Sequence, residues 1–443
     1  MNKFSFISLG CAKNRVDSET VIGELIGQGF QLVPECAGAE IVIINTCAFL
    51  REARMESMET IKKIVRLKKT SQTLNKIVVI GCLAQYIKQF GGEGSELKDV
   101  DLIIPVDDMS NTLKRLGALM SFPVVRKKVG IGAPQKDYRR FLTCPPHSVY
   151  IKITDGCNNH CAYCLIPSIR GPLKSKPIED VAAEVLAVEK LGAKEINLIG
   201  QDISLYGYDT YGQPTLIKLI NRLLASVSKI QWIRLLYVHP ARIDDRLIQL
   251  MANEPVICNY IDMPIQHVNG RILDRMGRNI TREGLINTVE QLREHGIALR
   301  TTVMTGYPGE KEEDFQELLD FLRRYPFDRL GGFAFSPEKG TRAYFQGPKV
   351  KKETAEMRIN TILKQQKTIS KNLNRKLLGK VRSALVESYD SSKKKAYGRL
   401  YSQAPEVDGK VIIPNAQGLQ PGQFTTIKIT AVGSYDFLGE RII

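Results

Sequence analysis

The residues most able to do chemistry in this sequence are three cysteines, Cys157, Cys161 and Cys164, spaced C-x3-C-x2-C. Three thiolates, and not four, indicate an open metal site. A cubane iron–sulfur cluster held by three cysteines keeps one iron without a protein ligand, and that iron can bind a small molecule and pass it an electron. The spacing therefore predicts a redox centre.

Two other uses of these cysteines compete with a cluster. A structural zinc site would need His160 as a fourth ligand, but zinc prefers two spaced pairs of ligands, and His160 stands directly beside Cys161, where the two side chains diverge. A disulfide framework is typical of small secreted domains, whereas this chain has 443 residues and opens without a charged-then-apolar leader. No apolar run approaches the roughly 20 residues that span a bilayer. We expect a cytoplasmic protein with no membrane partner.

The N-terminal region alternates short apolar strands with amphipathic helices, which predicts a doubly wound parallel sheet. Strands are expected over 4–9, 40–45, 76–80 and 102–104, and helices over 17–28, 51–68 and 84–90.

Cys11, Cys47 and Cys82 stand where the first three of these strands end. Parallel strands bring their carboxyl ends to one edge of the sheet, so the three thiols should converge as a second metal site. The alternative is that they are small packing residues, which is how we interpret the remaining cysteines, Cys36, Cys144 and Cys258.

From residue 148 strands and helices alternate again, in about six units, which predicts a partial TIM-like (β/α) barrel. Strands are expected over 149–154, 195–199, 232–236, 260–263, 298–304 and 330–335, with helices over 177–191, 215–226, 244–253, 281–295 and 312–325. The three-cysteine loop follows the first strand, at the end where barrel enzymes keep their catalytic groups. His239 and His267 follow later strands and could be acid–base or structural groups.

Charge and composition complete the domain plan. The net charge is +16, and residues 121–142 hold six Lys or Arg against one Asp, which predicts a basic linker and favours a polyanionic partner. A long basic helix over 351–376 precedes β-rich segments that predict a small antiparallel barrel. We expect domains over 1–120, 143–375 and 376–443, with the linker over 121–142.

With this order of domains, the chain resembles the methylthiotransferases of the radical S-adenosylmethionine (SAM) superfamily, whose C-terminal barrel is a TRAM domain. Within that family the run Ser8-Leu9-Gly10-Cys11-Ala12-Lys13-Asn14, the segment Asp155–Gly171, and Asp408-Gly409 after Ala404-Pro405-Glu406 are similar to the RimO type.

The resemblance implies two 4Fe-4S clusters, one on Cys157, Cys161 and Cys164, where SAM would be split to a radical, and one on the cysteines of the first domain, through which sulfur would arrive. It also implies SAM contacts by Tyr163, Gly200 and Gln201. The implied product is 3-methylthioaspartate on ribosomal protein S-twelve of the small subunit. An electron donor such as flavodoxin or ferredoxin and a sulfur source would be further partners.

Two alternatives stay open at this point. A tRNA adenosine methylthiotransferase would use the same two clusters and hold RNA with its basic regions, and its binding would fall steeply with salt. A non-enzymatic iron–sulfur or RNA-binding scaffold would have no need for an iron without a protein ligand.

Overall fold

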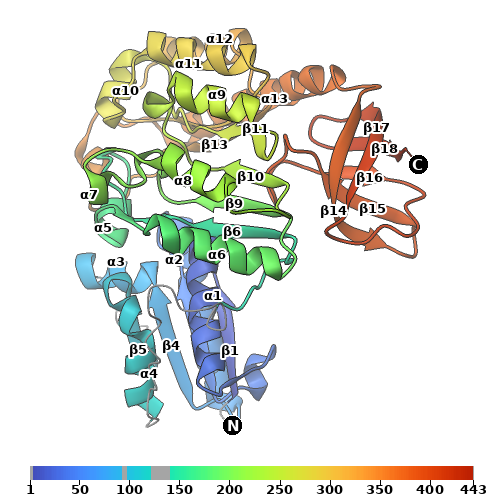
Figure 1. Ribbon diagram of the computed structural model, residues 1–443. Helices are drawn as coiled ribbons and strands as arrows, with labels where there is room; N and C mark the ends of the chain where they lie inside the picture. Colours follow the sequence, from blue (N-terminus) through green and yellow to red (C-terminus); the bar gives the residue numbers. More distant parts are fainter. Residues whose placement is uncertain (1–2, 92–96, 121–139, 443) are drawn as a thin grey trace.

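The computed structural model describes residues 3–91, 97–120 and 140–442 (Figure 1). A parallel sheet formed by the N-terminal residues lies at one end, a second parallel sheet lies in the middle, and a small barrel of C-terminal residues lies to the side. Most of the predicted basic linker, residues 121–139, falls outside the described residues. No described helix combines the length and apolar character needed to cross a membrane.

The N-terminal sheet has five parallel strands in the order β2-β1-β3-β4-β5. They are β1 (Lys3–Ser8), β2 (Gln31–Leu32), β3 (Ile41–Thr46), β4 (Lys76–Gly81) and β5 (Leu102–Pro105). Apolar residues of α1 (Ala12–Gly27) and α4 (Thr112–Met120) cover one face, and those of α2 (Arg51–Thr70) and α3 (Cys82–Phe90) cover the other. Helices on both faces of a parallel sheet make this unit doubly wound, as predicted.

Helix α1 begins five residues earlier than the apolar pattern indicates, directly after Cys11. Its first turn contains Lys13, Asn14 and Arg15, which are polar, so an apolar periodicity cannot reveal it. The early start is consequential because it places Lys13 and Asn14 beside the strand ends.

The central sheet has six parallel strands in the order β13-β12-β11-β10-β9-β6. They are β6 (Ser148–Lys152), β9 (Glu195–Ile199), β10 (Trp232–Leu235), β11 (Ile257–Asp262), β12 (Ala298–Thr305) and β13 (Arg329–Ala334). Five helices bury their apolar sides against it: α6 (Ile178–Lys190), α8 (Leu216–Leu224), α9 (Asp245–Asn253), α11 (Arg282–Glu294) and α12 (Glu312–Arg324). The predicted partial barrel is thereby confirmed.

The C-terminal strands close into a five-stranded barrel in the order β14-β15-β16-β18-β17. They are β14 (Val381–Asp390), β15 (Lys395–Arg399), β16 (Val411–Ile413), β17 (Phe424–Val432) and β18 (Phe437–Arg441). Helix α13 (Lys352–Arg375) leads from the central sheet to this barrel. We propose the predicted domain boundaries for this chain, because α4 ends at Met120 and α13 at Arg375.

One apolar cluster joins all three units. Val16 of α1, Tyr150 of β6, Trp232 of β10 and Leu385 of β14 are all buried in it. Because the cluster spans the N-terminal sheet, the central sheet and the barrel, it fixes how the edges of the two sheets face each other.

Candidate active site

The carboxyl ends of the two sheets enclose one cavity of about 710 Å³. All six of the predicted ligand cysteines line it: Cys11, Cys47, Cys82, Cys157, Cys161 and Cys164. The first three follow β1, β3 and β4, and the other three lie between β7 (Thr154–Asp155) and α5 (Ile166–Arg170). The topology therefore brings two cysteine triads from separate sheets to a single space.

Glycine makes the close approach within the N-terminal triad possible. Gly10 has φ 90°, and a Cβ at this position would lie 2.8 Å from the Cβ of Cys47. Asn14 ties the same loops together, because its Nδ2 donates hydrogen bonds to the carbonyls of Leu9 and Thr46, each at 3.0 Å. Its Oδ1 lies 3.7 Å from the sulfur of Cys82.

Backbone N–H groups face the sulfurs of the second triad. The N–H of Asn159 donates to Cys157 Sγ at 3.4 Å, and that of Ile166 donates to Cys164 Sγ at 3.4 Å. Hydrogen bonds to sulfur stabilise the charged thiolate form. The loop is suited to holding anionic sulfur ligands.

Burial dominates the acidity of most of these thiols. It raises the pKa of Cys82 and of Cys157 to about 11 and that of Cys164 to about 12, so a bound metal must displace their protons. Burial also acts to raise the pKa of Cys11, but Lys13 and backbone N–H groups outweigh it and the pKa is lowered. Cys11 is therefore predisposed to form a thiolate.

The residues present fit the two groups that the sequence implies. Each triad offers three soft sulfur ligands, which suit iron–sulfur clusters. Within the described part of the chain, no three His, Cys, Asp or Glu side chains are arranged to hold a single metal ion. Buried polar atoms of cavity-lining residues also lack protein partners in this part of the chain, namely Gln201 Oε1, Gln266 Oε1 and Arg278 Nε. Such atoms suit a polar ligand such as SAM.

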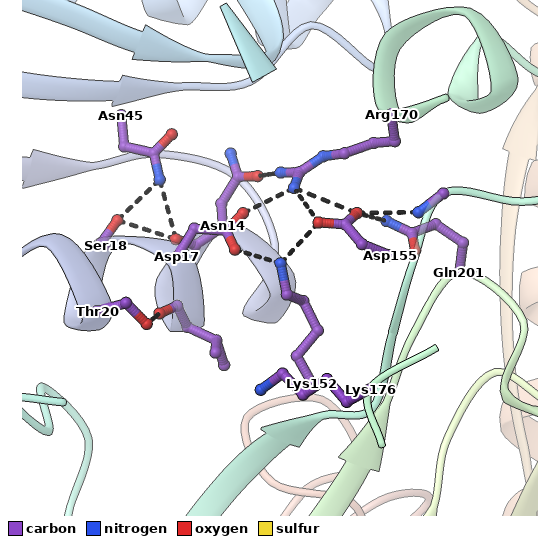
Figure 2. Close-up of polar contacts among 12 residues, drawn as sticks. Asn14, Asp17, Ser18, Thr20, Asn45, Lys152, Asp155, Arg170, Lys176 and Gln201 are labelled. Atoms are coloured by element: carbon purple, nitrogen blue, oxygen red, sulfur yellow. Dashed lines mark hydrogen bonds and ion pairs between the residues drawn. The ribbon is translucent and has the colours of Figure 1, made fainter. Parts of the chain in front are cut away.

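An ionic network that includes the cavity-lining residues Arg170 and Gln201 joins the two sheets (Figure 2). Arg170 of α5 donates to Asp17 of α1 at 2.7 Å and to Asp155 at 3.3 Å. Lys152 of β6 pairs with the same two carboxylates, at 2.7 Å from Asp155. Gln201 donates to the other oxygen of Asp155 at 3.2 Å. Because Asp17 belongs to the N-terminal unit, these pairs hold the two triads in a fixed relation.

The remaining predicted residues fall in different places. Tyr163 and Gln201 line the cavity, whereas Gly200 is not among its lining residues. A Cβ on Gly200 would lie 2.0 Å from Thr154 Oγ1, so this glycine allows the end of β9 to lie against β7. His239 lines the cavity and His267 does not; burial lowers the pKa of both to about 3, which keeps them neutral.

Sequence reasoning missed the charged residues of the site, including Lys13, Asp17, Lys152 and Arg170. The available signal was a lysine inside the predicted strand 149–154, because a charge in a fully buried strand needs a partner. Asp155, three positions away, is one partner of this lysine, but the other, Asp17 of the N-terminal unit, could be identified only from the fold.

Comparisons with known families find a match in each of three parts of the chain. Residues 151–322 match the Radical SAM superfamily, residues 3–104 match Uncharacterized protein family UPF0004, and residues 378–442 match the TRAM domain. Among solved structures, the radical S-adenosylmethionine methyltransferase TsrM from Kitasatospora setae has a similar fold. The TM-score is 0.55 at 15% identity, over 75% of this chain and 72% of that one.

Curated relatives extend over nearly the full length. The chain is 38% identical to "Ribosomal protein uS12 methylthiotransferase RimO" of Acetivibrio thermocellus, over 99% of this chain and 98% of the relative. It is 39% identical to the protein of the same name from Syntrophotalea carbinolica, over 99% and 97%. The chain is therefore an enzyme that belongs to the RimO family of radical SAM methylthiotransferases.

Proposed function

We propose that this enzyme adds a methylthio group to the β-carbon of one aspartate of ribosomal protein uS12, giving 3-methylthioaspartate. The observation that carries the proposal is the single cavity lined by both cysteine triads. A reaction that must cleave SAM, open a carbon–hydrogen bond and deliver sulfur to the same carbon requires these functions in one space. The names of the full-length relatives support uS12 as the substrate.

Cys157, Cys161 and Cys164 are proposed to hold the 4Fe-4S cluster that the radical SAM family implies, and Cys11, Cys47 and Cys82 a second one. When bound, the first cluster supplies the electron that splits SAM, and the second supplies the site from which sulfur is transferred. We also propose that flavodoxin or ferredoxin provides the electron and that a separate sulfur source feeds the second cluster.

The protein's own residues orient the reactants. Gln201 lies in the cavity with its Nε2 fixed by Asp155, so its free oxygen can accept a hydrogen bond from SAM. Tyr163 is proposed to pack on the adenine, since its ring lines the cavity within the cysteine loop. Gly200 would contribute only through its backbone. The neutral imidazole of His239 can exchange hydrogen bonds in the cavity without adding charge.

Turnover by the purified enzyme tests this function. Enzyme with both clusters reconstituted is incubated with SAM, a reductant, a sulfide source and unmodified uS12, and the protein is then analysed by peptide mass spectrometry. A gain of one methylthio group on a single aspartate supports the proposal. Unmodified uS12, with a methylthio-adenosine formed instead in added tRNA, would move the enzyme to the tRNA-modifying branch.

A further inference from the structure

Three lysine or arginine side chains line the cavity: Lys13, Arg170 and Arg278. Arg170 is neutralised by Asp17 and Asp155. Arg278 donates to the carbonyl of Pro264 and lies 3.9 Å from Cys161 Sγ, so it belongs with the second triad. Each of these two cations therefore has a defined protein partner.

Lys13 is different. In the described part of the chain no carboxylate lies within ion-pair distance of its ammonium group, although the side chain is only 9% exposed. Asp262, an acidic residue at the end of β11, is paired with Arg300 at 3.1 Å. With no protein carboxylate as its partner, this buried ammonium group can pair with an anion that enters the cavity.

An aromatic ring of the cavity wall positions the ammonium group of Lys13. Its Nζ lies 3.4 Å from the centroid of the Tyr237 ring, which also lines the cavity. Tyr237 has φ 66°, in the left-handed region that side chains other than glycine rarely adopt, and such residues concentrate at functional sites.

The position of Lys13 along α1 strengthens this argument. It lies in the first turn of the helix, where the positive end of the helix dipole disfavours a cation, and this turn has no acidic residue. The fold thus places a buried positive charge, with no carboxylate partner among the described residues, next to the N-terminal triad.

We propose that Lys13 is a substrate-binding residue that pairs with the side-chain carboxylate of the target aspartate. This inference rests on the proposed function. The β-carbon of aspartate is bonded directly to its carboxylate carbon, so an ion pair that holds the carboxylate also fixes the carbon that reacts. Both triads line the same cavity as Lys13, so a residue bound by Lys13 lies in the space that they share.

The competing role for Lys13 is to balance the negative charge of a cluster on Cys11. The two roles differ in one measurable property: only a substrate-binding role makes the effect of Lys13 depend on the charge of the substrate residue. The test is a double-mutant cycle on binding, with the reconstituted enzyme and uS12 in which the modified aspartate is either retained or replaced by asparagine.

For the wild-type enzyme, we expect the asparagine form of uS12 to bind about ten- to a hundred-fold more weakly than the aspartate form, the range expected for loss of a charge-assisted hydrogen bond. For Lys13→Met, the two forms should bind equally. Lys13→Arg keeps the positive charge and should restore the preference for aspartate. The control Lys190→Met, an exposed lysine at the end of α6, should retain the full preference.

The inference is overturned if Lys13→Met prefers aspartate as strongly as the wild-type enzyme does, whether or not the electron paramagnetic resonance signal of the N-terminal cluster changes. Mass spectrometry on the wild-type reaction separates this failure from a failure of the proposed function. If wild-type enzyme modifies uS12 while the cycle shows no coupling, only the role of Lys13 is wrong. If it does not modify uS12, the function itself is wrong.

Discussion

Replacing Glu195 with glutamine should loosen the attachment of the C-terminal barrel to the central sheet. Glu195 of β9 is fully buried and accepts from Arg234 of β10 at 2.9 Å and from Ser148 at 2.7 Å. It also pairs with Arg399 of the barrel strand β15, which is 1% exposed. One carboxylate therefore bridges two buried guanidinium groups that belong to different domains.

The expected loss of stability in Glu195→Gln can be calculated from the pKa of the Glu195 carboxyl group. Burial acts to raise its pKa, but Arg399 and Arg234 outweigh burial and lower it from 4.5 to about 2. A difference of roughly 2.5 pKa units at about 1.36 kcal/mol each corresponds to about 3 kcal/mol of stability at neutral pH. Breaking a buried ion pair by removing one partner costs a similar amount, about 3–5 kcal/mol.

The lowered pKa of Glu195 also determines how its contribution to folding stability depends on pH. Because the folded pKa of Glu195 lies below the unfolded value, its contribution is present above pH 4.5 and is lost as the pH falls toward about 2. The difference in stability between wild type and Glu195→Gln should therefore be full at pH 7 and shrink across that acid window.

The single tryptophan of the chain supplies the assay. Trp232 of β10 packs edge-on against Phe424 of β17, with ring centroids 4.8 Å apart, so its emission reports separation of barrel and sheet. Urea titrations at pH 7 should show a lower midpoint for Glu195→Gln, and little change for the control Glu179→Gln, whose pair with Arg222 is exposed. Equal midpoints for wild type and Glu195→Gln would refute the reasoning.

Three further predictions concern the site. Cys161→Ala should abolish SAM cleavage, measured as 5′-deoxyadenosine, while iron analysis and spectroscopy still detect the N-terminal cluster; unchanged cleavage would refute the assignment. Cys47→Ala should cleave SAM but give no methylthiolated product, and wild-type product levels would remove this residue from the sulfur site. Asp17→Asn leaves two buried cations short of a counter-charge, so it should lower the free energy of unfolding by about 3 kcal/mol. The exposed control Asp320→Asn should change it by under about 1 kcal/mol, and a similar loss in both would contradict the network of Figure 2.

The sequence predicted the fold well because the spacing of apolar residues indicates strands and helices, and their order along the chain indicates the type of sheet. An apolar run at strand spacing predicted β9 with its observed ends. The rule that parallel strands end at one edge predicted that Cys11, Cys47 and Cys82 lie close together, and all three line the cavity. The meeting of both triads in one cavity depends on how two sheets pack, and no local pattern encodes it.

The charged part of the site was beyond sequence reasoning for a related reason. The sequence predicted Asp17 as the first residue of a helix and Lys13 as a polar residue before it, because the apolar pattern does not include the first turn of α1. Asp17 is buried where α1 packs against β6, and Lys13 lies against Tyr237, so both depend on contacts between residues more than a hundred positions apart. The glycines directly before Cys11 and Cys82 are local signs of close approach, because a Cβ at Gly10 or Gly81 would come within 3.0 Å of a neighbouring side chain.

The most direct test of the central claim is mass spectrometry of both uS12 and total tRNA nucleosides from cells with and without this gene. We expect a methylthio group on one aspartate of uS12 to disappear with the gene while methylthiolated tRNA nucleosides are unchanged. Loss of a methylthio-adenosine from tRNA, with uS12 unaltered, would contradict it.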